Sequence, residues 1–162
     1  MQVPQLHLLT GSIPAQTSDV SLNRLSGSIP GGFGAFSRLT VLDLSRNQLS
    51  GSIPASFTGL RKIKLMYLYN NKLSGSIPIG LGSLTNRAAL FIYNNSLSGS
   101  IPTGLGSLTK LLALDLSGNS LSGPIPSAIG NMRDLKHLIL TENNLSGSIP
   151  PSLEGLLFLQ RL

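Results

Sequence analysis

Residues 108–125 read LTKLLALDLSGNSLSGPI, and this stretch carries the pattern that decides the fold. In Leu114-Asp115-Leu116 two apolar residues flank a polar one, which is the pattern of a β-strand with one buried face. A strand this short cannot bury its leucines alone, so the stretch predicts one unit of a larger stack. The apolar positions of the unit are Leu108, Leu111, Leu114, Leu116, Leu121 and Ile125.

The same unit recurs along the chain. The string SGSIP begins at Ser26, Ser50, Ser74, Ser98 and Ser146, and SGPIP begins at Ser122, so each start follows the last by 24 residues. A constant period of this length is typical of a solenoid, in which neighbouring units share one continuous core. Residues 24 apart are therefore expected to stand side by side, with their strands paired in parallel about 4.8 Å apart.

An asparagine precedes every SGSIP or SGPIP by three residues. The chain has to turn inward after each strand, which removes backbone N–H and C=O groups from water. An asparagine amide both donates and accepts hydrogen bonds on a short stem, so we expect it to satisfy these groups. This predicted structural ladder consists of Asn23, Asn47, Asn71, Asn95, Asn119 and Asn143.

The spacing N-x-L-S-G-x-I-P-x-x-L-G-x-L, which covers about Asp19 to Leu162, resembles that of the plant-specific leucine-rich repeats. Such repeats form the ectodomains of plant receptor-like kinases and receptor-like proteins, and the polygalacturonase-inhibiting proteins. The resemblance implies an α/β leucine-rich repeat solenoid of about six 24-residue repeats. It implies a right-handed superhelix with a concave parallel sheet, a second short strand at S-G-x-I-P, and 3₁₀ turns on the convex side. It also implies an extracellular, apoplastic or plasma-membrane surface location.

The two ends depart from this pattern. Residues 1–18 are interpreted as a truncated first repeat, in which His7 falls in the asparagine column and Pro4 in a strand position, and residues 19–162 as the solenoid. No cysteine-containing cap is expected at either end, so end-to-end self-association is a predicted risk. The N-terminal residues lack the pattern of a signal peptide, and no apolar stretch is long enough to insert into a membrane.

Arg87 is an exception inside the repeat. The corresponding positions hold Leu39, Ile63, Leu111, Leu135 and Leu159, all expected in the core. A guanidinium at this place must either reach outward to water or remain unpaired among apolar side chains.

The composition gives no support for catalysis. The chain has no cysteine, only two histidines far apart in the sequence, and no recognised nucleophile, metal or phosphate-binding motif. We therefore predict no enzyme activity, no catalytic residue, no metal and no cofactor. The net charge is +6, but apart from the cluster Arg61, Lys62 and Lys64 the basic residues are scattered, and no nucleic-acid motif accompanies them. An acidic polysaccharide is the alternative partner that this charge suggests.

The candidate binding surface follows from strand alternation. Side chains flanking the inward residues of each strand must point to the concave face, so Tyr67, Phe91, Tyr69 and Tyr93 are expected to form one aromatic patch. The alternative is that the rings merely stabilise the sheet by cross-strand stacking. The expected border and rim consist of Asp43, Asp115, Lys64, Asn70 and Asn94. Asn94 and Asn144 also begin N-x-S/T sequences, which makes them glycosylation candidates.

These observations favour non-catalytic recognition of a protein or peptide by the concave sheet. The resemblance implies a role in hormone or pathogen perception, with inhibition of a pathogen polygalacturonase as a narrower version. Ice binding by a regular outward face is the alternative function. The outward columns mix Asp, Tyr, Phe, Ser and Ile where an ice-binding face would need a uniform array, which counts against it.

Overall fold

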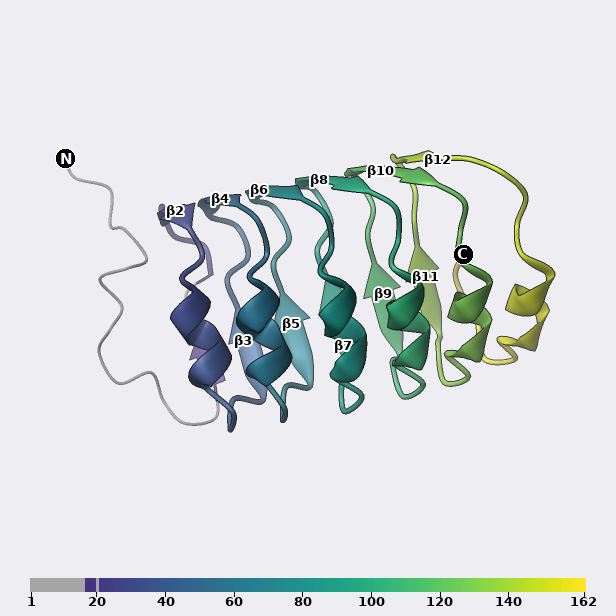
Figure 1. The fold of residues 1–162 in the computed structure, drawn as a ribbon, viewed down its shortest axis with the longest axis horizontal. Coiled ribbons are helices and arrows are strands. Elements are labelled where there is room, and N and C mark those ends of the chain that lie inside the picture. Colours follow the sequence, from purple (N-terminus) through teal and green to yellow (C-terminus); the bar gives the residue numbers. More distant parts are fainter. Residues whose placement is uncertain (1–16, 20) are drawn as a thin grey trace.

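The computed structural model describes residues 17–19 and 21–162, and it is a stack of similar coils (Figure 1). Each coil contains a first strand, a second strand and a 3₁₀ helix, in that order. In Figure 1 the 3₁₀ helices form a row in front of the first strands, and the second strands run along the upper edge. The leucine-rich repeat solenoid expected from the repeat is therefore confirmed.

The first strands form one parallel sheet in the order β1-β3-β5-β7-β9-β11. Their register follows the 24-residue period, so that Asp43, Tyr67, Phe91 and Asp115 are successive partners across four strands. In β3, β5, β7, β9 and β11 the central residue is buried in the core. Its two neighbours point to the other face, here called the outer face. The strands are β1 (Thr17–Asp19), β3 (Val41–Asp43), β5 (Leu65–Tyr67), β7 (Ala89–Phe91), β9 (Ala113–Asp115) and β11 (His137–Ile139).

The second strands form another parallel sheet, in the order β12-β10-β8-β6-β4-β2. In β2 to β10 they include the S-G segments, where the resemblance implied a second short strand, whereas β12 ends just before Ser146 and Gly147. Their bounds are β2 (Ser26–Ser28), β4 (Gln48–Gly51), β6 (Lys72–Gly75), β8 (Ser96–Gly99), β10 (Ser120–Gly123) and β12 (Asn144–Leu145).

A proline precedes each 3₁₀ helix and sets its start. Pro102, with φ of −65°, stands at the N-cap of its helix, a position that needs no donated N–H. Neighbouring helices approach so closely that a Cβ at Gly106 would collide with the backbone carbonyl of Ala128 in the next helix. The helices are η2 (Gly31–Ala35), η3 (Ala55–Gly59), η4 (Ile79–Ser83), η5 (Thr103–Ser107), η6 (Ser127–Asn131) and η7 (Pro151–Gly155).

Side-chain amides of the asparagine column link successive coils. Oδ1 of Asn119 accepts a hydrogen bond from the N–H of Leu97 at 3.0 Å, one coil earlier. Nδ2 of Asn119 donates to the carbonyls of Ile92 and Leu116, at 3.1 and 3.0 Å. Asn71, Asn95 and Asn143 make the equivalent bonds. Backbone groups that the inward turn removes from water are thus satisfied from both sides.

Arg87 lies in the core with none of its surface exposed. Its Nη2 contacts the sulfur of Met66 at 3.6 Å, while Nε and Nη1 have no hydrogen-bond partner among the described residues. Of the two outcomes open to this side chain, reaching outward or remaining unpaired, the structure has the second. Burial lowers the pKa of Arg87 to about 9, because an apolar environment disfavours the charged form.

Several sequence expectations fall at the edge of the described residues or beyond it. His7 and Pro4 lie outside them, so the truncated first repeat and the boundary between residues 1–18 and 19–162 stay predictions. Within the described ranges, no helix is long and apolar enough to cross a bilayer.

Candidate functional site

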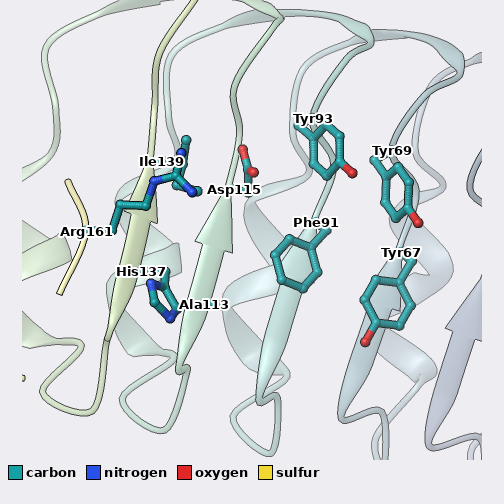
Figure 2. A pocket seen from close by; sticks show the side chains of 9 residues that line it. All are labelled: Tyr67, Tyr69, Phe91, Tyr93, Ala113, Asp115, His137, Ile139 and Arg161. Atoms are coloured by element: carbon teal, nitrogen blue, oxygen red, sulfur yellow. The ribbon is translucent and has the colours of Figure 1, made fainter. Parts of the chain in front are cut away.

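Four aromatic side chains of β5, β7 and the residues just after them gather on the outer face (Figure 2). Tyr67 stacks on Phe91, with ring centroids 5.5 Å apart and planes 7° apart. Tyr69 stacks on Tyr93 in the same way, at 4.5 Å and 6°. Tyr67 also meets Tyr69 edge to face, at 6.3 Å and 86°. We call these four residues the aromatic cluster.

All four rings of the aromatic cluster are half-buried. The rings stack with those of the neighbouring strand, which is the cross-strand arrangement that the alternative interpretation invokes. Part of each ring nevertheless remains accessible on the outer face. Stacking within the sheet and contact with a partner are therefore compatible.

Two aspartates flank the aromatic cluster in the same row of the sheet. Oδ1 of Asp115 accepts hydrogen bonds from the N–H and the hydroxyl of Ser117, at 3.0 and 2.6 Å. Asp43 is held in the same way by Ser45, at 2.9 and 2.7 Å. Both carboxylates are half-buried and fixed in position, so each places a negative charge at one end of the row Asp43-Tyr67-Phe91-Asp115.

An arginine covers one end of the aromatic cluster. The Arg46 guanidinium carbon lies 5.8 Å from the centroid of the Tyr69 ring. Arg46 follows β3, so it approaches Tyr69 from the side opposite to Tyr93, which follows β7. This is the geometry of a cation–π contact.

The phenols of Tyr67 and Tyr93 are protonated at neutral pH, because the pKa of each is raised. Burial raises the pKa of Tyr67, and the charge of Asp43 and the neighbouring Tyr69 raise it further. Burial also raises the pKa of Tyr93, with smaller contributions from Tyr69 and Asp115 in the same direction and from Arg46 in the opposite one. Each hydroxyl is therefore available as a hydrogen-bond donor to a partner.

A cavity of about 470 Å³ opens beside the aromatic cluster, above β9 and β11. The short side chains of Ala113 and Asp115 lie between the rings on one side and the side chains of His137, Ile139 and Arg161 on the other (Figure 2). Arg161 reaches this place because its backbone bridges to His137. The complete lining is Tyr67, Tyr69, Phe91, Tyr93, Ala113, Asp115, His137, Ile139 and Arg161.

The cavity includes only part of the predicted site. Lys64 is exposed before β5, and Asp43 lies at the far end of the row, so neither lines it. Asn70 and Asn94 adopt left-handed backbone conformations at the ends of the strands, and the Asn94 amide donates to Asn70 Oδ1 at 2.9 Å. These two asparagines therefore connect neighbouring coils, and they too stay outside the lining.

Sequence reasoning missed Ala113, His137, Ile139 and Arg161 at this site. Ile139 lies in the same column as Phe91 and Asp115. Ala113, His137 and Arg161 belong to the column that precedes the inward residue of each strand, and strand alternation points that column outward as well. Reading that third column would have found them. Of the glycosylation candidates, Asn94 and Asn144 are both exposed.

The arrangement is suited to binding. Within residues 17–19 and 21–162, no group of three or more His, Asp or Glu side chains could hold a metal ion. What the outer face offers is ring surface, phenolic donors, a fixed carboxylate and a cavity.

Comparisons with known proteins agree with this architecture. Two family models, both described as leucine-rich repeat, match the chain, one over residues 19–73 and the other over residues 89–108, 110–132 and 134–156. No curated protein matches. The solved structures that resemble it include plant receptor ectodomains.

The PEPR1–AtPEP1 complex is 39% identical over 89% of this chain and 20% of that chain, with a TM-score of 0.87. The Arabidopsis receptor kinase HAESA, solved with the peptide hormone IDA and the co-receptor SERK1, is 35% identical over 91% and 29%, with a TM-score of 0.82. The BIR3–SERK2 complex from Arabidopsis thaliana is 38% identical over 82% and 70%, with a TM-score of 0.69. The chain thus spans less than a third of the length of the first two receptors.

Proposed function

The chain belongs to the plant leucine-rich repeat family of receptor ectodomains, and from that premise we propose that it is a non-catalytic recognition module. Its ligand is a peptide or protein that contacts the outer face of the β1–β11 sheet. We place this face on the extracellular side of the plasma membrane, because the structures to which the chain is similar include the ectodomain of the receptor kinase SOBIR1.

The observation that carries the proposal is the aromatic cluster with the cavity beside it. Tyrosine rings bring a large contact area with few rotatable bonds and keep a hydroxyl for hydrogen bonding, so they dominate many protein interfaces. Here the rings are held by stacking before any ligand arrives. A ligand therefore loses little of its binding energy in ordering them.

The similar structures support a peptide as the ligand class. HAESA was solved with a peptide hormone and a co-receptor, and PEPR1 was solved with AtPEP1. Polygalacturonase inhibition, ice binding, binding of acidic polysaccharide and end-to-end association stay predictions from the sequence.

Removing two rings is expected to abolish most of the binding. Peptides selected from a random display library on the purified chain should bind the Tyr69→Ala, Tyr93→Ala double variant at least about tenfold more weakly, because a stacked pair of anchors is lost. Isothermal titration calorimetry on both proteins measures the difference. Circular dichroism spectra establish that both are folded.

The control is Ile79→Ala, which removes an exposed apolar side chain from η4, away from the outer face. Its affinity for the selected peptides should equal that of the unchanged chain. Equal affinity of the tyrosine double variant and the unchanged chain would overturn the proposed function.

A further inference from the structure

The two ends of the aromatic cluster share the same flanking aspartate but differ in the side chain that follows it. Asp43 and Asp115 occupy the same position three repeats apart, and each flanks the rings with a carboxylate held by a following serine. On the β3 side Arg46 stands on the face of Tyr69. On the β9 side the residue equivalent to Arg46 is Gly118.

Gly118 shows that the backbone is the same at both ends. Arg46 has a φ of 54° and Gly118 a φ of 59°, so both continue from their strands in the left-handed conformation. Only the side chain differs, and at Gly118 it is absent. The chain's own cation thus covers Tyr69 at one end of the aromatic cluster, while no equivalent side chain projects over Tyr93 at the other end.

The uncovered end opens into the cavity. Figure 2 shows Phe91 and Tyr93 on one side of Asp115, with Ile139 and Arg161 on the other. The surface of the sheet between these two groups is recessed, because the side chain of Ala113 is small and that of Asp115 is turned toward Ser117. We call the space bounded by Phe91, Tyr93 and Asp115 the β9 slot.

Asp115 supplies an unused acceptor in the β9 slot. Both hydrogen bonds from Ser117 end on Oδ1, and no hydrogen bond from the described residues reaches Oδ2. The negative charge of Asp115 acts on Tyr93, because it contributes to the raised pKa of that phenol. A cation here would lie between a carboxylate and the negative face of an aromatic ring, and both attract it.

From this asymmetry we propose that the β9 slot binds the guanidinium of an arginine side chain in an extended peptide ligand. The guanidinium takes the place at Tyr93 that Arg46 takes at Tyr69, and it pairs with Asp115 Oδ2. A planar guanidinium stacks on a ring face and forms directed hydrogen bonds to a carboxylate, which an ammonium group does less well. This inference rests on the proposed function, because it names the chemistry of the ligand.

Arg161 and His137 lie on the far wall of the cavity. Arg161 is exposed and, in Figure 2, reaches alongside Ile139 on the side of Asp115 away from the rings. Its charge competes with a ligand guanidinium for Asp115. The Arg161→Ala variant is therefore expected to bind an arginine probe more tightly.

The direct test is an NMR titration of the full chain with N-acetyl-arginine amide. The ring protons of Phe91 and Tyr93 and the methyl protons of Ala113 should shift along a saturable curve. N-acetyl-citrulline amide has the same shape without the charge, and should bind at least about tenfold more weakly. N-acetyl-lysine amide should fall between the two.

Two pairs of variants locate the binding. Asp115→Asn should weaken arginine binding about tenfold, whereas Asp43→Asn, at the end that Arg46 covers, should leave it unchanged. Gly118→Arg supplies an internal guanidinium and should abolish binding. Gly118→Ala is its control, since it adds the same Cβ against the Asn94 side chain without a charge. Melting curves of each variant establish that it is folded.

Equal binding of arginine and citrulline amides, or equal effects of Asp115→Asn and Asp43→Asn, would overturn the inference. The proposed function fails by a different result. Library-selected peptides that depend on Tyr69 and Tyr93 but not on an arginine refute the β9 slot alone. An arginine amide that binds in the β9 slot, with selected peptides indifferent to the tyrosines, refutes the proposed function alone.

Discussion

The Arg87→Leu variant is expected to be more stable than the unchanged chain by about 3 kcal/mol in the free energy of unfolding. Arg87 is fully buried, and two of its guanidinium nitrogens have no partner among the described residues. Moving a charged group out of water without pairing it costs several kcal/mol, and an apolar side chain of similar volume removes that cost. A gain of this size corresponds to roughly 6–12 °C in melting temperature for a chain of this length.

Circular dichroism melting curves at pH 7 measure this effect. Arg87→Met serves as a second variant, because its unbranched side chain follows the path of the arginine stem and fills the same space. Leu111→Arg places a guanidinium at the equivalent position one repeat later, and should destabilise the chain. A melting temperature lower in both Arg87→Leu and Arg87→Met than in the unchanged chain would contradict the prediction.

The advantage of Arg87→Leu should shrink at high pH. Burial lowers the pKa of Arg87 to about 9, against 12.5 in the unfolded chain. Between these values the unfolded state holds more protons than the folded state, so the stability of the unchanged chain rises with pH. Chemical denaturation of both proteins at pH 8 and pH 10.5 should show a difference that narrows by about 2 kcal/mol. A constant difference would show that Arg87 keeps its proton throughout this range.

Gly106→Ala is expected to destabilise the chain by about 3 kcal/mol or more. Gly106 is buried in η5, and a Cβ there would collide with the backbone carbonyl of Ala128 in η6. A backbone atom cannot swing aside as a side chain can, so the two helices would have to separate. Urea denaturation of the variant measures the loss.

The matched control is Gly32→Ala in η2. The same helix type surrounds this glycine, but apart from its two chain neighbours and the backbone of η2, no atom of the described residues lies within 4 Å of the Cβ that it would carry. A methyl group there meets only open space, so the stability should stay within about 0.5 kcal/mol of the unchanged chain. Equal losses in the two variants would show that helix propensity, and not the close approach, decides the effect.

The architecture was predictable because one period determines it. With residues 24 apart side by side, strand alternation alone assigns Tyr67 and Phe91 to the same row of the outer face. The second sheet and the 3₁₀ helices followed from the resemblance of the repeat to plant leucine-rich repeats. None of these expectations needed side-chain detail.

The details of the site depend on side-chain torsions, which a repeat pattern does not encode. The pattern places Arg46 beyond the end of a strand but does not say that its guanidinium turns onto Tyr69. Asn70 and Asn94 are in the right rows, yet their left-handed backbones direct the amides to each other. The cavity also needs the column of His137 and Arg161, which the first two outward columns do not include.

The uniform register of the β1–β11 sheet also limits how many residues of a crossing peptide can align with its strands. Strands repeat about every 4.8 Å across the sheet, whereas an extended peptide lying across them advances about 3.4 Å per residue. The two spacings differ, so they coincide only after about seven residues and five strand spacings, which both span about 24 Å. The strands of the sheet would therefore align with a crossing peptide at only one or two of its residues. The side chain bound at such a residue then fixes the position of the remaining residues along the sheet.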